Sequence, residues 1–390
     1  MKRTLTYLSL AALLTLAGCK DESNPSTVPS TDELEKAALT NYANLVYANY
    51  SDAYDGAKAM SDKINAFLAA PSAAGLDAAR QAWRDARVPY GQTEAFRFYG
   101  GPIDGDNGPE SYINGWPLDE SYIDYVKGSP TAGIINDPAT YPTITKQLLI
   151  DLNEKDSETH LSTGWHAIEF LLWGQDFNAN GPGDRSYTDY TTATNATRRG
   201  EYLKAVTELL LDQLGEVRDA WQTDAAYRKE FTTTGDTKTM LSNMFRGIAA
   251  LSKGELAGER LAVALASHDQ EDEHSCFSDN THVDIAMNFK GIQNVYMGTY
   301  ARTDGTVIKG TGLADIVAQV SAQKNQAVLN AFGSTQTSVD KIVANAPFDQ
   351  EILTDAGGYI AATIDGLRTL SDRIVDAAFS LGIQVNGNTE

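Results

Sequence analysis

Cysteine is the scarcest reactive side chain in this 390-residue sequence. The chain has two, Cys19 and Cys276, and only five histidines. Two thiols allow at most one disulfide, and none forms within the chain if Cys19 is lipidated as argued below. Stability must therefore come from an apolar core, and a hydrophobic content of 42% is ample for a chain of this length.

Positive charge is also sparse, because 31 Lys and Arg face 52 Asp and Glu, a formal net charge of -21. This balance argues against nucleic acid as a partner and is compatible with binding cations. After Cys19 no run of 18 consecutive apolar residues occurs, so we expect membrane attachment by a lipid anchor only.

The amino-terminal residues have the features of a secretory signal. Lys2 and Arg3 precede an apolar run from 5 to 17, and "LAGC" ends at Cys19. This pattern resembles a bacterial lipobox and predicts a lipoprotein signal peptide over 1–18, lipidation of Cys19 and a flexible tether over 19–30. An ordinary signal peptide with an incidental cysteine is the alternative. Lys20 in place of Asp favours a cell-envelope location at the outer membrane, facing the periplasm or the surface.

Hydrophobic periodicity predicts an all-α protein, because no alternating stretch of convincing length interrupts the helical patterns. We expect two antiparallel helical-bundle halves, over about 31–222 and 236–383, with a site in the cleft between them. Long single helices are predicted within the second half, including 236–267, 312–332 and 349–381.

The stretch "GWHAIEFLLWG" is the first candidate site. His166 and Glu169 are three residues apart, so they share a helix face, and an imidazole with a carboxylate suits zinc or iron. Gly164 permits close approach of another backbone. The alternative is a structural ion pair beneath Trp165 and Trp173.

A second candidate is "SHDQEDEHSCFSDNTHVD", residues 267–284, which holds three of the five histidines among six carboxylates. Glu271 and His274 have the carboxylate–histidine spacing of di-iron bundles. The alternative is a solvated acidic loop. Hydroxyls that could support metal ligands lie at Ser275, Ser278 and Thr281.

A third candidate is "PYGQTEAFRFYGG", in which Glu94 and Arg97 share a helix face. Glu94 would contribute a carboxylate to a site between the halves, and Arg97 would orient it or bind an anionic ligand. A core salt bridge packed by aromatic rings is the alternative.

Together these motifs resemble the imelysin family, whose Gly-x-His-x-x-Glu motif is matched by "GWHAIE". Residues 82–98, the "WPLDE" of 116–120 and "EDEHSCFSDNTHVD" resemble its iron-regulated protein A branch. The resemblance implies one imelysin-like domain over 31–383, an all-α fold of two related bundles, and a role in iron acquisition. The metal ligands that we predict are His166, Glu169, Glu94, His274, Asp279 and His282.

Three functions remain open at this point. The first is capture of iron, free or as a complex, for delivery to iron-uptake transporter components. The second is a zinc metallopeptidase that uses the same motif, with Glu273 as base and Arg97 as electrophile. The third, a di-iron oxidase, lacks the second Glu-x-x-His pair that it requires. We predict capture without catalysis, with iron preferred over zinc.

Overall fold

A computed structural model describes residues 29–385. Cys19, the signal peptide and most of the predicted tether lie outside the described residues. The prediction of an all-α protein is confirmed, since helices make up most of the described chain. One small antiparallel hairpin, β1 (Thr299–Ala301) and β2 (Val307–Lys309), was not predicted.

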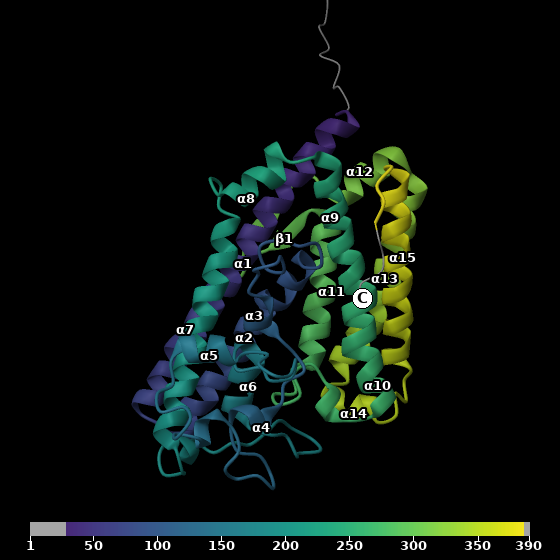
Figure 1. Ribbon diagram of the computed structural model, residues 1–390. Coiled ribbons are helices and arrows are strands. Elements are labelled where there is room, and N and C mark those ends of the chain that lie inside the picture. Colours follow the sequence, from purple (N-terminus) through teal and green to yellow (C-terminus); the bar gives the residue numbers. More distant parts are fainter. Residues whose placement is uncertain (1–28, 386–390) are drawn as a thin grey trace, which may run out of the picture.

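The first half is built on three long helices, α1 (Thr31–Ala69), α2 (Ala73–Thr93) and α7 (Ala196–Ala220), with α1 packed against the other two (Figure 1). Helix α1 begins with a capping box in which Ser30 and Glu33 satisfy each other's backbone N–H groups. Between α2 and α7 the chain forms short elements: η1 (Glu94–Phe96), α3 (Glu110–Asn114), α4 (Glu120–Ile123), η2 (Ile134–Asn136), α5 (Lys146–Leu152), α6 (Gly164–Trp173) and η3 (Tyr187–Tyr190).

In the second half α15 packs against α13, α9 and η5. Its elements are α8 (Ala226–Lys229), η4 (Glu230–Thr234), α9 (Thr237–Ala250), the π-helical η5 (Leu251–Ala262), α10 (Val263–Ser267), η6 (Gln270–Asp272), α11 (Thr281–Met297), α12 (Leu313–Val320), α13 (Ala322–Ala344), α14 (Phe348–Ile352) and α15 (Tyr359–Ser380).

The prediction of one helix over 312–332 was wrong. Ser321 adopts an extended conformation that ends α12, and its hydroxyl accepts from Lys324 N–H to begin α13. The helix predicted over 349–381 is likewise divided, into α14 and α15.

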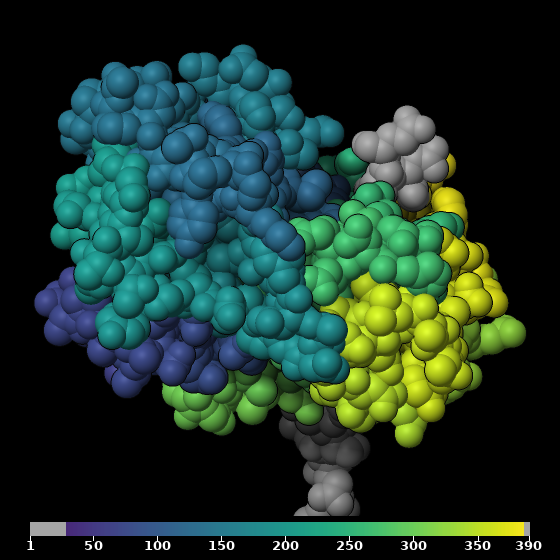
Figure 2. Space-filling model, turned by 90° about the horizontal axis from the view of Figure 1, so that it is seen from below, coloured from purple at the N-terminus to yellow at the C-terminus, as the bar shows by residue number. Residues whose placement is uncertain are grey.

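Helix α11 joins the halves because it packs against both α2 and α13. A side chain at Gly291 would stand 2.4 Å from the Gln92 carbonyl oxygen, so glycine permits this close crossing. One continuous cluster of buried apolar residues extends through both halves. Figure 2 shows the blue and teal atoms of the first half bordering the green and yellow atoms of the second. None of the helices between residues 29 and 385 combines the length and hydropathy that a membrane-spanning segment requires.

Candidate metal site

Helix α6 carries His166 and Glu169 on one buried face. Gly164 begins this helix with φ +88°, and a Cβ there would lie 2.6 Å from the Ile113 carbonyl oxygen of α3. Only glycine allows α6 to start so close to α3. His166 Nδ1 then lies 3.0 Å from Glu169 Oε2, and both side chains are buried. The predicted pair is therefore formed.

The second oxygen of Glu169 is fixed by the loop that precedes α11. Ser278 donates to Oε1 from its backbone N–H at 3.0 Å and from its hydroxyl at 2.7 Å. Burial raises the pKa of Glu169 to about 8, against the hydrogen bonds from Ser278, which lower it. Ser278 was among the hydroxyls expected to support a ligand, and it holds the carboxylate across 109 residues of sequence.

The same loop places His274 beside a second buried carboxylate. His274 Nδ1 lies 2.8 Å from Asp284 Oδ2, which also accepts from the Ser275 hydroxyl at 2.5 Å and from Arg87 Nη2 at 3.0 Å. Burial alone would raise the pKa of Asp284, but Arg87 and His274 hold it well below its usual range. Asp284 is thus an ionised acceptor that orients the His274 ring.

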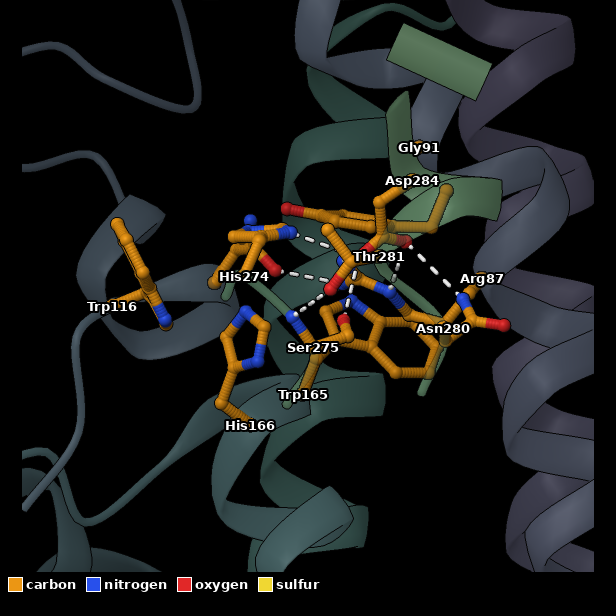
Figure 3. Close-up of polar contacts among 12 residues, drawn as sticks. Arg87, Gly91, Trp116, Trp165, His166, His274, Ser275, Asn280, Thr281 and Asp284 are labelled. Carbon is orange, nitrogen blue, oxygen red and sulfur yellow. Dashed lines mark hydrogen bonds and ion pairs between the residues drawn. The ribbon is translucent and has the colours of Figure 1, made fainter. Parts of the chain in front are cut away.

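The two imidazoles face each other across a very small space (Figure 3). Their ring centroids are 4.6 Å apart at 73°, and neither Nε2 has a hydrogen-bond partner. Both rings line an inner cavity of about 20 Å³. Burial, reinforced by Arg260, lowers the pKa of His274 to about 3, and burial with Arg87 places the pKa of His166 well below its usual range. Each ring is therefore neutral near pH 7.

The carboxylate beside each Nδ1 determines what the Nε2 atoms can do. A neutral imidazole that donates Nδ1–H to a carboxylate presents a lone pair at Nε2, as in carboxylate–histidine–metal units. For His274 we infer this tautomer from the contact with the ionised Asp284, and His166 takes it when Glu169 loses its proton. The donor chemistry of these two buried nitrogens fits a metal ion.

Glu94 lies in η1 and is surrounded by donors. Its Oε1 accepts from Tyr90 Oη at 3.2 Å, and its Oε2 accepts from Arg97 Nη1 and Arg260 Nη2, each at 2.7 Å. Despite its burial, the two guanidiniums lower the pKa of Glu94. Arg97 contacts Glu94, but this carboxylate is already paired with two guanidiniums and has no free charge to offer an ion.

Asp279 and His282 occupy a different place. Both line a surface pocket of about 510 Å³ that also includes Arg84 and shares no lining residue with the inner cavity. Burial together with Asp349 and Asp176 raises the pKa of Asp279 to about 7. The structure therefore does not bring these two predicted ligands to His166 and His274.

Glu271 and His274 do not lie on an α-helix. Gln270–Asp272 forms a 3₁₀ turn, Glu271 is exposed and His274 is buried, so the helical di-iron geometry is not built here. Over residues 29–385 no three His, Cys, Asp or Glu side chains are arranged to hold one ion. The six predicted ligands are thus not assembled around a single point. Among the three predicted histidine ligands, His166 and His274 are the two whose rings lie together.

A family model described as Imelysin matches residues 46–374, most of the chain. The chain belongs to the imelysin family. It is 28% identical over 269 residues to iron-regulated protein A of Synechococcus elongatus, a match that covers 67% of this chain and 63% of that relative's length. The match thus spans less than two thirds of that relative's length.

Two crystal structures share the imelysin fold of this chain. One is a proposed iron-regulated protein A precursor from Parabacteroides distasonis, with a TM-score of 0.72, 19% identity and coverage of 91% of this chain and 97% of that one. The other is an imelysin-like protein from Psychrobacter arcticum, with a TM-score of 0.63, 15% identity and coverage of 92% and 98%. At these identities the likeness concerns the fold.

Two arginines of this imelysin site had no predicted role. Arg87 binds Asp284 and lies within the motif of residues 82–98 that carries the family resemblance. Arg260 lies on η5, where π-helical winding places Glu255, five residues earlier, within 2.8 Å. The sequence motif of residues 82–98 could have indicated a role for Arg87, whereas no pattern near Arg260 in the sequence indicated one.

Proposed function

We propose that this imelysin-family chain captures a single iron ion between His166 Nε2 and His274 Nε2, with zinc as the alternative metal. The observation that carries the proposal is the pair of buried, unpartnered Nε2 atoms on rings 4.6 Å apart. Neutral imidazole nitrogen is a good ligand for iron and zinc, and a buried acceptor without a partner is otherwise unfavourable.

Glu169 and Asp284 act as supporting carboxylates in this proposal. Each contacts the Nδ1 of one imidazole, which fixes the ring and increases the basicity of its Nε2. Two protein nitrogens leave the other coordination positions of the ion to at most one water, because the inner cavity has a volume of only about 20 Å³. Such incomplete coordination suits a cargo that is taken up and later released.

The zinc peptidase alternative has less support from the geometry. Burial raises the pKa of Glu273, the nominated base, well above its usual range, which favours the neutral carboxyl over the charged base. Arg97, the nominated electrophile, is paired with Glu94 and Glu110. The inner cavity of about 20 Å³ has room for an atom-sized species and not for a peptide.

The proposal includes a place of action in the cell envelope. The lipobox-like "LAGC" supports a lipid anchor at Cys19, and the name of the Synechococcus relative supports a role connected with iron. An anchored capture protein at the outer membrane would pass iron to transporter components. Replacement Cys19→Ser should move the protein from the membrane fraction to the soluble fraction, and unchanged membrane attachment would remove the anchor from the proposal.

Metal affinity measured by isothermal titration calorimetry tests the site itself. Anaerobic Fe(II), Fe(III) and Zn(II) are titrated into the wild type and into His166→Ala and His274→Ala. We expect affinity to fall by about 100-fold or more in each variant, because each loses one of two protein ligands. His282→Ala, a histidine of the separate surface pocket, is the matched control. Wild-type affinity in both site variants would refute the proposal.

A further inference from the structure

A larger chamber adjoins the inner cavity and is formed by both halves of the chain. This outer chamber has a volume of about 340 Å³ and includes Arg97 and Glu110 from the first half, and Glu255 and Arg260 from η5. Trp116 and Pro117 line both the outer chamber and the inner cavity. They therefore form the wall between the chamber and the two unpartnered imidazole nitrogens.

Negative charge is in excess in the outer chamber. Four glutamates line it against two arginines. Both guanidiniums are already neutralised by buried or half-buried carboxylates, since Arg97 lies 2.7 Å from Glu94 and 2.9 Å from Glu110, and Arg260 lies 2.8 Å from Glu255.

The remaining two glutamates, Glu154 and Glu158, are exposed at the rim of the outer chamber. Their charges have no guanidinium left to balance them. A concave surface with an excess of one charge attracts ions of the opposite sign and raises their association rate.

The two volumes differ in what they can hold. At about 30 Å³ per water, 340 Å³ has room for about ten waters, enough for a cation with its hydration shell. The inner cavity, at about 20 Å³, has room for about one water-sized species. An ion that moves inward must therefore exchange most of its water, and the two Nε2 atoms are unpartnered acceptors that can replace part of it.

Trp116 occupies the boundary between these volumes. Its ring packs against His274 with centroids 5.7 Å apart, and its indole N–H donates to the Glu273 carbonyl oxygen at 3.2 Å. In Figure 3 the Trp116 ring stands on the side of the histidine pair opposite Trp165.

We propose that the cargo reaches His166 and His274 as a hydrated cation through the outer chamber, and not as an anionic chelate, with Trp116 as the partition that it passes. This inference rests on the proposed function and specifies the form of its metal. Glu154 and Glu158 attract the cation, and the same charges repel a chelate with net negative charge.

Association kinetics of Fe(II) with the full chain in detergent, measured anaerobically by stopped flow, test the inference. The double variant Glu154→Gln and Glu158→Gln should associate at least about threefold more slowly at low ionic strength. Its dissociation rate should be unchanged, and added salt should remove the difference. Glu216→Gln with Asp365→Asn removes two exposed charges that do not line the chamber and should leave the rate unchanged.

Ferric citrate, a chelate with net negative charge, is the second probe. We expect no binding of the intact chelate to the wild type, whereas tighter binding of it than of Fe(II) would overturn the inference. An unchanged association rate in the Glu154/Glu158 variant would also overturn it. If His166→Ala and His274→Ala still weaken Fe(II) binding by about 100-fold or more in that case, the proposed function survives. If the wild type binds no metal, both fail.

Trp116→Ala provides an independent measurement. Removal of the partition should accelerate association and dissociation of Fe(II) together by about tenfold, with the equilibrium affinity changed less than either rate. Slower association, or unchanged rates in both directions, would show that Trp116 is not the partition.

Discussion

Arg87 and Asp284 form an ion pair at 3.0 Å in which each side chain is only 1% exposed. The two residues are 197 positions apart and connect α2 to α11, the helix that joins the halves. Asp284 also contacts His274 Nδ1, so one carboxylate serves both the packing of the halves and the orientation of a candidate ligand.

Replacement Asp284→Asn should destabilise the fold by about 3–5 kcal/mol, because it leaves the buried Arg87 charge uncompensated. Urea denaturation measures the free energy of unfolding. Asp62→Asn breaks an exposed ion pair with Lys58 and should change that free energy by less than about 1 kcal/mol. Equal losses in the two variants would contradict a structural role for the buried pair.

Replacement Gly164→Ala should lower the free energy of unfolding by about 1–3 kcal/mol, because it forces a Cβ against the Ile113 carbonyl oxygen at a residue with positive φ. Gly333→Ala is the control: this exposed residue of α13 has nothing within 4 Å of a new Cβ. We expect that change to stabilise by about 0.5–1 kcal/mol. Thermal unfolding of both variants distinguishes the cost of a Cβ at the first residue of α6 from a general effect of an added methyl group.

Replacement Ser278→Ala removes the hydroxyl donor to Glu169 Oε1 and retains the backbone N–H. The carboxylate then orients His166 less firmly, so we expect Fe(II) or Zn(II) affinity to decrease by about tenfold. Ser334→Ala, which removes a hydroxyl bonded to the Ala331 carbonyl, should leave the affinity unchanged. Calorimetric titration gives both affinities. Equal affinities in the two variants would show that the Ser278 hydroxyl does not support the metal site.

The raised pKa of Asp279 predicts that the stability of the folded protein depends on pH. Its pKa is raised to about 7 by burial and by neighbouring Asp349 and Asp176, whereas an aspartate in an unfolded chain titrates near about 4. The folded state thus keeps a proton that the unfolded state has lost, and stability falls as the pH rises through this window.

Replacement Asp279→Asn should therefore raise the thermal midpoint at pH 8 by about 1–2 °C and reduce the gain in stability between pH 8 and pH 5. Asn tolerates the positive φ of this position. The exposed Asp106→Asn should preserve the wild-type profile. A profile for Asp279→Asn that parallels the wild type would contradict the assignment.

The sequence by itself determined the helical class and the His166–Glu169 pair. Both follow from spacing along a few residues, since helical periodicity and i, i+3 proximity are local properties. The division at Ser321 was missed although it is local, because apolar periodicity continues across it and an N-cap serine is easily taken for a polar surface residue.

Only the tertiary structure decided which histidine meets His166. His274 and His282 belong to one segment of similar composition, yet His274, in the loop before α11, lines the inner cavity, whereas His282, in the first turn of α11, lines the surface pocket. Glu94 was expected to offer a carboxylate, but Arg260, 166 residues away, pairs with it. Whether a donor atom ends without a partner depends on side chains more than a hundred residues distant in sequence, and local spacing cannot specify them.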